Sequence, residues 1–254
     1  MNAPGKTVVS LRDVGKTFES GTVALDRINL EVGAGEFVSL LGPSGCGKST
    51  ALRLIAGLSA ASQGAVAVPS SAGKLGFVFQ EPTLMPWADV AANVRLPLKL
   101  AGADNAYSQD AVAQALDRVG LAEFAQRYPR ELSGGMRMRT SIARALVTEP
   151  ELLLMDEPFA ALDEITRFKL NNDLLGLWQA QRRTVIFVTH SVFESVYLSQ
   201  RIVVMTPRPG RVFAEIAIPA AYPRDERFRT SAEYAGFCRT VSEALSQAMT
   251  GGAL

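Results

Sequence analysis

The chain has 254 residues, 48% of them hydrophobic, and its 26 lysines and arginines against 25 aspartates and glutamates give a net charge of +1. The length and apolar fraction exclude a disordered chain, and the balanced charge argues against a broad nucleic-acid-binding surface, which shows a basic excess. Cys46 and Cys238 form no disulfide framework and indicate a reducing compartment; without a signal core or an apolar run of about 20 residues, any membrane role is expected through a partner.

Short β-rich runs and turns make up the first third of the chain, and a helical block follows. In chain order we expect strands at 7–11, 24–32 and 36–41, a glycine-rich turn at 42–50, a helix with Leu52 and Ile55 buried and Gly57 at its C-terminal cap, and a strand at 74–79. From Pro86 to Pro150 the pattern is mostly helical, with helices at 108–127 and 136–148. Met138, Ile142 and Ala145 recur at helical spacing in the second of these.

Strands and helices alternate again after Pro150. The expected elements are strand 152–155, helix 163–181, strand 184–189, helix 192–199, strand 202–205 and, from Pro219, a loop with one weakly amphipathic helix. In the first helix we expect Ile165, Phe168, Leu175 and Trp178 to share a face. This alternation predicts a mainly parallel sheet covered on both faces, with the helical block inserted between two of its strands.

The glycine-rich turn matches the phosphate-binding pattern G-x-x-x-x-G-K-[ST]. Its glycines let backbone N–H groups converge on phosphate oxygens, and the following helix adds the positive end of its dipole. Lys48 is expected to reach the β- and γ-phosphates, and the Ser49 hydroxyl to bind Mg²⁺. An ordinary glycine turn is the alternative, which the flanking strand and helix disfavour. The predicted ATP-binding residues of this loop are Gly42, Pro43, Ser44, Gly45, Cys46, Gly47, Lys48, Ser49 and Thr50.

A second apolar run, Leu152–Met155, delivers two carboxylates, Asp156 and Glu157, at the end of a predicted buried strand. Ligands bind at the carboxyl ends of strands in an open α/β sheet. Asp156 suits a Mg²⁺ shell, through water, and Glu157 suits the polarisation of an attacking water. A solvated acidic turn is the alternative, and it becomes the minor one beside a phosphate loop.

Two further features, the start of the helix after Ser133 and the position of His190, are interpreted together with the phosphate loop. Ser133 is expected to cap a helix that begins with Gly134 and Gly135, which makes a second anion site, although a structural cap is the default for this motif alone. Two phosphate-binding elements in one chain suggest a nucleotide held between two copies. His190, the single histidine, ends the strand 184–189; a structural histidine is the alternative, but its place at the carboxyl edge of the sheet favours a functional one.

Taken together, these residues resemble the ATP-binding cassette (ABC) ATPases over roughly residues 8–215. The motifs are the phosphate loop, a strand ending at Gln80, LSGG at 132–135, LLLMDEP at 152–158, ALD at 161–163 and His190. The resemblance implies an α/β P-loop ABC ATPase with a RecA-like core, an antiparallel β-subdomain and an inserted helical subdomain. The implied domain spans residues 8–235, with the helical insertion at about 86–150 and a C-terminal helix or tail at 236–254.

The resemblance also implies roles for single residues. Phe18 is similar to the aromatic platform under adenine, and Asp163 belongs to the loop that crosses the dimer interface. Ser133, Gly134 and Gly135 would bind the γ-phosphate of the nucleotide held by the other protomer. The implied catalytic residues are Glu157, His190, Lys48 and Gln80, and the implied Mg²⁺ ligands are Ser49, Gln80 and Asp156, with ATP as the nucleotide.

A finer resemblance is to the ATPase subunits of bacterial importers for nitrate, sulfonates and taurine, through the single-cassette length, LMPW at 84–87 and PRPGRV at 207–212. It implies a homodimer on two permease subunits at the cytoplasmic face of the membrane, with an extracytoplasmic substrate-binding protein acting indirectly and no nucleic acid. The loop 81–89, with Met85 and Trp87, would form part of the groove for a permease helix; packing on the helical subdomain is the alternative. Met136 and Met138 replace the usual glutamines after the signature glycines, and Phe18 replaces a tyrosine.

Three other classes remain as alternatives. A P-loop kinase or GTPase has no use for LSGG, and a DNA-repair or chromosome-structuring ABC ATPase would carry a long coiled coil between the half-motifs. A catalytically weak regulatory cassette would bind ATP without turnover, although Lys48, Asp156, Glu157 and His190 are all present. The transported solute is not encoded in this chain, because in such importers the binding protein and permease select it.

Overall fold

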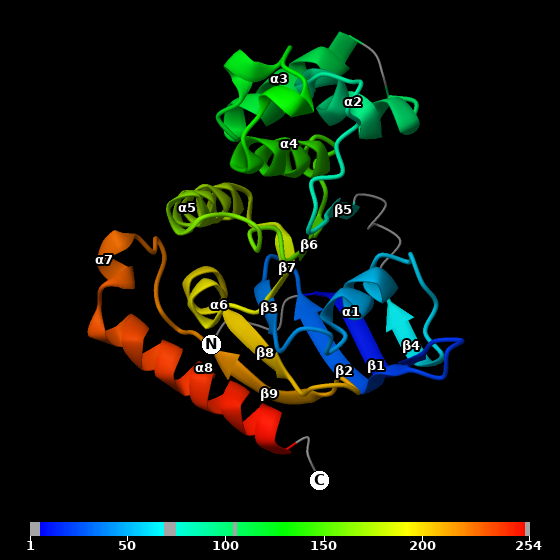
Figure 1. Cartoon of the computed structure of the whole chain (residues 1–254), viewed down its shortest axis with the longest axis vertical. Coiled ribbons are helices and arrows are strands. Elements are labelled where there is room, and N and C mark those ends of the chain that lie inside the picture. Colours follow the sequence, from blue (N-terminus) through cyan, green and yellow to red (C-terminus); the bar gives the residue numbers. More distant parts are fainter. Residues whose placement is uncertain (1–5, 69–74, 104–105, 252–254) are drawn as a thin grey trace. The chain divides into compact units, whose positions relative to one another are not determined.

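The structure, a computed structural model, describes residues 6–68, 75–103 and 106–251. The chain divides into two compact units, one comprising Met1–Ser71 and Arg182–Leu254 and the other Ala72–Gln181. Figure 1 shows the elements of both. Within the described residues, no helix combines the length and the apolar character needed to cross a membrane.

The first unit holds two groups of strands. One is a three-stranded antiparallel sheet in the order β2-β1-β4, made of β1 (Thr7–Thr17), β2 (Val23–Gly33) and β4 (Gln63–Ala67). The other has the order β7-β3-β8-β9 and is made of β3 (Phe37–Leu41), β7 (Thr184–Thr189), β8 (Arg201–Met205) and β9 (Val212–Ala217). In it, β7, β3 and β8 are parallel, and β9 returns antiparallel to β8.

Burial explains why β3 and β7 are the central strands. All of their side chains are buried, as expected for parallel strands that are covered on both faces and read as continuous apolar runs. The rings of Phe37 and Phe187 pack at 6.1 Å between centroids. Residue Leu41, the last of β3, pairs with Thr189, the last of β7. Whatever follows these two residues therefore leaves the sheet at the same edge.

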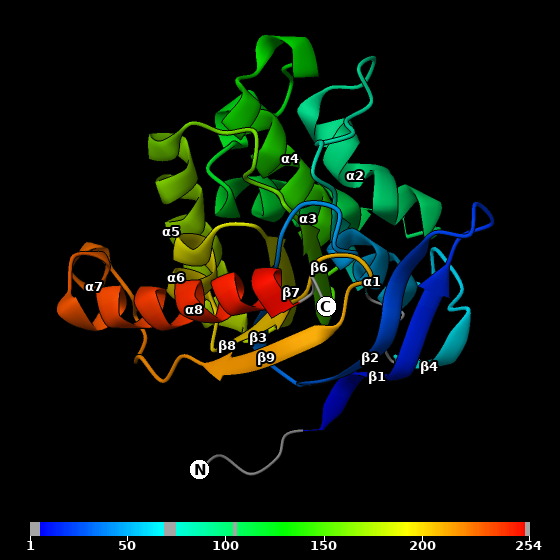
Figure 2. The same cartoon turned by 60° about the horizontal axis from the view of Figure 1, so that its bottom comes forward.

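The helices in the described part of the first unit are α1 (Lys48–Ile55), α6 (Val192–Leu198), α7 (Glu226–Arg229) and α8 (Ala232–Gly251). Helix α8 packs against α6, β8 and β9 (Figure 2). The buried Arg224, which precedes α7, binds α6 and the segment that follows β9. Its guanidinium donates to five backbone carbonyls, those of Val196, Tyr197, Ser199, Ile218 and Ala220. Burial lowers the pKa of Arg224, and the carbonyls and the Tyr222 ring, 4.1 Å away, compensate for the lost water.

The second unit pairs two parallel strands with four helices. The strands are β5 (Leu75–Val78) and β6 (Leu152–Asp156), and the helices are α2 (Val90–Leu100), α3 (Ala106–Arg118), α4 (Gly134–Leu146) and α5 (Glu164–Gln181). Helices α2, α3 and α4 pack on one another, and α4 also contacts α5 and β5. Because α4 is central to these contacts, it buries Met138, Ile142 and Ala145, as its spacing predicts.

The structure confirms most expected elements and corrects several. The helix expected at 108–127 is present but shorter: α3 ends at Arg118, since Gly120 adopts a left-handed φ of 66°, and a short 3₁₀ turn follows at Ala122–Phe124. The helix cap expected at Gly57 is one residue earlier, at Ala56, and Gly57 follows with a φ of 69°. Residue Lys74 of the expected strand 74–79, and residues 252–254 of the tail, lie outside the described residues.

The apolar face expected on helix 163–181 is wrong in its first half. Ile165 is 82% exposed and Phe168 is 41% exposed, whereas Leu175 and Trp178 are buried. The buried face of α5 instead begins at Leu170. Two strands, β4 and β9, and the short helix α7 were not expected from the sequence. The domain limits 8–235, 86–150 and 236–254 stay predictions.

Candidate functional site

The phosphate loop connects β3 to α1 in the first unit. Gly45 and Gly47 adopt left-handed φ angles of 75° and 103°, which other residues rarely do. A Cβ on Gly47 would lie 2.6 Å from the Leu25 Cδ2 and 2.8 Å from the Ala24 O. The N-cap of α1 is Gly47, which has no side chain to cap the N-terminus of this helix. Backbone N–H groups at this helix start are therefore not taken by a side-chain cap.

Lys48 lies at the centre of this loop. Its side chain is only 3% exposed, and its Nζ donates to the Gly42 O at 2.7 Å and the Pro43 O at 3.0 Å. The ammonium thus closes the loop on itself. Phosphate oxygens, being charged, are stronger acceptors than these carbonyls. Ser49 and Thr50 follow in the first turn of α1 and are both half-buried.

The register of the sheet brings His190 to the phosphate loop. Gly42 and His190 each come directly after the paired residues Leu41 and Thr189 of adjacent parallel strands. His190 is exposed, and Ser191 after it caps α6 by accepting a hydrogen bond from the Glu194 N–H. The expectation that His190 stands at the carboxyl edge of the sheet holds within this unit.

Phe18 lies directly after a strand of the antiparallel sheet in the same unit. It follows the last residue of β1, and its ring is 44% exposed. The Lys16 Nζ lies 5.5 Å from the ring centroid. An exposed ring of this kind offers a face for stacking.

Gln80, Asp156 and Glu157 come together in the second unit. Val78 of β5 pairs with Met155 of β6, so Gln80 and the two carboxylates leave the strand pair at the same edge. Asp156 is buried, whereas Glu157 is half-buried and has a left-handed φ of 44°. A non-glycine residue in this region costs free energy and is often found at functional sites.

The signature residues lie at the start of α4. Ser133 caps the helix, its Oγ accepting a hydrogen bond from the Met136 N–H at 3.3 Å, as expected. A Cβ on Gly135 would lie 2.7 Å from the Thr166 Cγ2, so a larger residue would force the Thr166 side chain to move. Asp163 accepts a hydrogen bond from the Thr166 N–H at 2.9 Å, which holds the pKa of this carboxyl below its ordinary value. Thr166 thus links Asp163 to the signature glycines.

The two methionines after the signature have different surroundings. Met138 is buried in the helical core, while Met136 is half-buried. Arg137 between them donates from its Nη1 to the Leu132 O at 2.7 Å. Met138 is therefore a packing residue, and only Met136 remains close to the surface of the signature turn.

Sequence reasoning missed two residues that shape the segment after Gln80. Arg144 of α4 donates to the Pro82 O at 2.8 Å, to the Thr83 O at 2.9 Å and to the Thr83 Oγ1 at 3.0 Å. Asn93 of α2, fully buried, accepts from the Met85 N–H and donates to the Met85, Ala88 and Asp89 carbonyls. The available signal in the sequence was that Arg144 and Asn93 are polar residues on the inner faces of helical segments.

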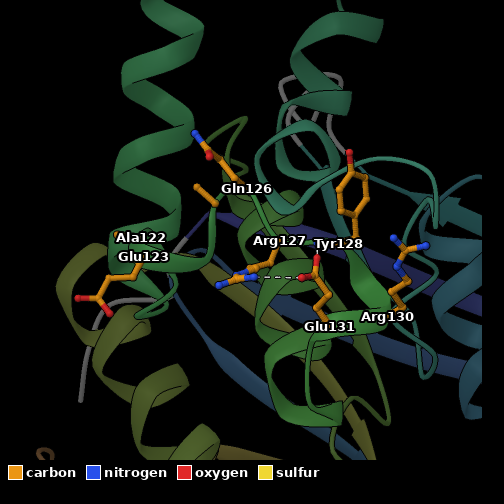
Figure 3. Close-up of a pocket in the computed structure, with 8 residues that line it drawn as sticks. Ala122, Glu123, Gln126, Arg127, Tyr128, Arg130 and Glu131 are labelled. Atoms are coloured by element: carbon orange, nitrogen blue, oxygen red, sulfur yellow. Dashed lines mark hydrogen bonds and ion pairs between the residues drawn. The ribbon is translucent and has the colours of Figure 1, made fainter.

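The hollows in the described part of the second unit include the following two. One, of about 600 Å³, is formed by residues 122–131 and contains none of the residues expected to bind ATP (Figure 3). In it, Glu131 accepts hydrogen bonds from the Tyr128 N–H and the Arg127 guanidinium, which lower the pKa of the carboxyl and stabilise the turn before Ser133. The other hollow, of about 310 Å³, is a mainly apolar groove lined by β5, the segment after Gln80, α2 and α4. We call it the α2–α4 groove.

The expected Mg²⁺ ligands have suitable chemistry. Ser49 offers a hydroxyl, Gln80 an amide oxygen and Asp156 a carboxylate, and Mg²⁺ prefers oxygen ligands, with few carboxylates beside substrate phosphates. Among the described residues, no three His, Cys, Asp or Glu side chains gather as a metal site. Each of these three donors is therefore of a type that binds Mg²⁺.

A glycine loop closed on a buried lysine, an acidic strand end and a Ser-Gly-Gly helix start are the parts of a P-loop ATPase of the cassette type. The family model described as "ABC transporter" matches residues 25–160, more than half of the chain. The chain belongs to this family and is an ATP-binding ABC ATPase.

Similar proteins agree with this family. An aliphatic sulfonates import ATP-binding protein of Pseudomonas syringae is 47% identical and covers 84% of this chain and 88% of its own length. An uncharacterized ABC transporter ATP-binding protein of Methanocaldococcus jannaschii is 46% identical, and the match covers 93% of this chain and 90% of that protein. Among solved structures, a dimeric ATP-binding cassette in a post-hydrolysis state with ADP and Pi is 34% identical, with a TM-score of 0.74 over 84% of this chain and all of that one. The expected fold class is confirmed.

Proposed function

We propose that this ABC ATPase is the energising subunit of an importer that takes up a small solute of the nitrate, sulfonate or taurine class through a membrane permease. The observation that carries the proposal is the 42–47% identity to aliphatic sulfonates import ATP-binding proteins over 84–86% of the chain. The chain would lie peripherally on the cytoplasmic face of the membrane. An extracytoplasmic binding protein would deliver the solute and select it.

The proposed chemistry divides among few residues. The loop from Gly42 to Thr50 binds the phosphates of ATP, with Lys48 on the β- and γ-phosphates and Phe18 under the adenine. Glu157 polarises the attacking water, His190 contacts the γ-phosphate, and Gln80 contacts the water. Mg²⁺, when bound, neutralises charge on the β- and γ-phosphates. Ser49, Gln80 and Asp156 would hold it.

The functional form is proposed to be a homodimer. Ser133, Gly134 and Gly135 of one copy would bind the γ-phosphate of the nucleotide held by the other, and Asp163 would cross the interface. The dimeric cassettes among the similar solved structures support this arrangement. Closing the dimer would pull the cytoplasmic ends of two permease subunits together, and hydrolysis would release them.

The permease is proposed to dock at the α2–α4 groove and the loop 81–89. Trp87 is 76% exposed and Leu100, which lines the groove, is 78% exposed. The bonds of Asn93 order the loop around Trp87, so the indole is presented on a fixed backbone. Exposed aromatic and aliphatic side chains beside a groove are typical of helix-in-groove binding, where truncating one commonly costs about 2 kcal/mol or more.

Trp87→Ala tests this docking. The melting temperature and basal ATPase of the isolated variant should remain close to those of the unmodified chain, because the indole is exposed. Copurification with the permease and solute uptake in vesicles should fall at least about tenfold. Tyr107→Ala is the matched control, since Tyr107 on α3 is 81% exposed but does not line the groove. A melting temperature lower by many degrees, or equal losses in both variants, would exclude the docking role.

A further inference from the structure

The turn between β8 and β9 carries the PRPGRV motif, which the proposed function leaves without a role. The turn is closed by its own bonds: the Thr206 N–H donates to the Arg211 O, the Arg211 N–H to the Thr206 Oγ1, and the Thr206 Oγ1 to the Pro209 O, all at 3.0–3.1 Å. A turn ordered in this way can hold another segment in place.

The turn is fixed to the start of β2. The Gly210 N–H donates to the Ala24 O at 2.9 Å, and the Asp26 N–H donates to the Gly210 O at 3.0 Å. The Arg211 guanidinium binds the Asp26 carboxylate, with Nε at 2.8 Å from Oδ2. Ala24 and Leu25 are also the residues that a Cβ on Gly47 would strike. The start of β2 therefore touches both the turn and the phosphate loop.

The turn also contacts the phosphate loop directly. The Arg208 Nε and Nη2 both donate to the Gly45 O, at 3.1 and 3.0 Å. A Cβ on Gly210 would collide with the Cys46 O, so the backbones of the turn and the loop are in contact there. Two successive carbonyls of the phosphate loop, those of Gly45 and Cys46, thus face the turn.

This contact matters because of how a phosphate loop works. Its N–H groups must converge on the ligand, and in each peptide group the carbonyl points opposite to the N–H. Gly45 is exposed and has a left-handed φ, and the only atom that its Cβ would meet within 4 Å is the Arg208 Nη2. The Cys46 N–H of the same peptide group donates to the Pro43 O at 3.3 Å, and Arg208 binds the carbonyl at its other end. A carbonyl turned inward would repel phosphate oxygens.

We infer that Arg208 is a positioning residue for the phosphate loop: its guanidinium holds the Gly45 carbonyl outward and so keeps the loop in the conformation that binds phosphate. Arg208 acts through the backbone of Gly45. The same loop binds phosphates before and during hydrolysis, so loss of Arg208 removes binding from the ground state and the transition state alike. Such a loss raises KM and leaves kcat nearly unchanged.

The test compares Arg208→Ala, Arg208→Lys and a matched control, Arg211→Ala, on the full chain. Arg211 belongs to the same turn and binds Asp26. The readouts are the Kd of ADP with Mg²⁺, the Kd of adenosine, the steady-state KM and kcat for ATP, and the melting temperature without nucleotide. Adenosine lacks phosphates and serves as the internal reference for general damage to the site.

For Arg208→Ala we expect the Kd of ADP and the KM for ATP to rise about tenfold, the scale of a lost charge-assisted hydrogen bond, with kcat and the Kd of adenosine within about twofold. Arg208→Lys should recover part of the loss, because a lysine keeps the charge but not the paired donors. Arg211→Ala should leave the Kd of ADP within about twofold, whatever its melting temperature.

Three results would overturn the inference. The first is an unchanged Kd of ADP in Arg208→Ala. The second is an equal rise for ADP and adenosine, which indicates general damage, and the third is an equal rise for ADP in Arg211→Ala, which indicates that the turn only supports folding. If Arg208→Ala does not fold, Arg208→Gln, which keeps a donor on a shorter stem, takes its place under the same criteria.

Discussion

Helices α1 and α4 both have glycines at their starts, yet their N-termini are built differently. No side chain caps α1, and the buried Lys48 closes its loop. Helix α4 is capped by the hydroxyl of the exposed Ser133, and the half-buried Arg137 binds the Leu132 carbonyl. Side-chain caps satisfy N–H groups that a ligand would otherwise bind. The difference fits the proposed roles, in which the start of α1 binds the nucleotide of its own copy and the start of α4 contributes to a nucleotide held by the other.

The largest expected effect on ATP hydrolysis comes from replacing Glu157, a change that leaves both helix starts intact. Glu157→Gln keeps the shape of the side chain but loses the charge that polarises water, so ATP hydrolysis should fall by at least about 10²-fold. Nucleotide binding should persist, and size-exclusion chromatography with ATP should show more dimer. Near-normal turnover would contradict the assignment of Glu157.

Mixing two inactive variants tests whether the two helix starts act in different copies. Lys48→Ala and Ser133→Arg chains should each show almost no ATPase activity alone. Their mixture should recover partial activity, because some dimers then keep one intact composite site. Activity of either variant alone, linear in protein concentration, would indicate a site complete within one copy.

The smallest expected effect is on stability and comes from adding a methyl group at Gly135, with the neighbouring Gly134 as the control position. In Gly135→Ala the new Cβ would lie 2.7 Å from the Thr166 Cγ2, whereas in Gly134→Ala it would lie 3.5 Å from the Leu162 Cδ2, an ordinary contact. Gly135→Ala should destabilise the fold by about 1–3 kcal/mol, and Gly134→Ala by much less. Urea unfolding measures both. Equal losses would mean that the packing of Gly135 on α5 is not the constraint.

The two helix starts also show what the sequence could predict. The phosphate loop, the acidic strand end and the Ser133 cap are local patterns, and each was predicted with its flanking elements. Contacts distant in sequence were not: Arg208 and Gly45 are 163 residues apart, and Arg144 and Thr83 are 61 apart.

The sequence analysis did not predict β4 and β9, and a physical reason can be given for β4. Most side chains of β4 are exposed, so it lacks the alternation that marks a half-buried strand, although β9 does alternate. The face expected on α5 failed because an apolar residue at helical spacing need not be buried, as Ile165 shows. The roles proposed for Gln80, Asp163 and His190 stay predictions.

The bonds of Lys48 to the Gly42 and Pro43 carbonyls have a consequence for how ATP arrives. The ammonium has already left water when the chain folds, so binding does not require it to be stripped of a hydration shell. With Lys48 in its proposed role, the arrival of a nucleotide is an exchange of partners, in which phosphate oxygens replace neutral carbonyls around a cation that is already in place. Such preorganisation reduces the free-energy cost of association. The nucleotide has to give up only its own water.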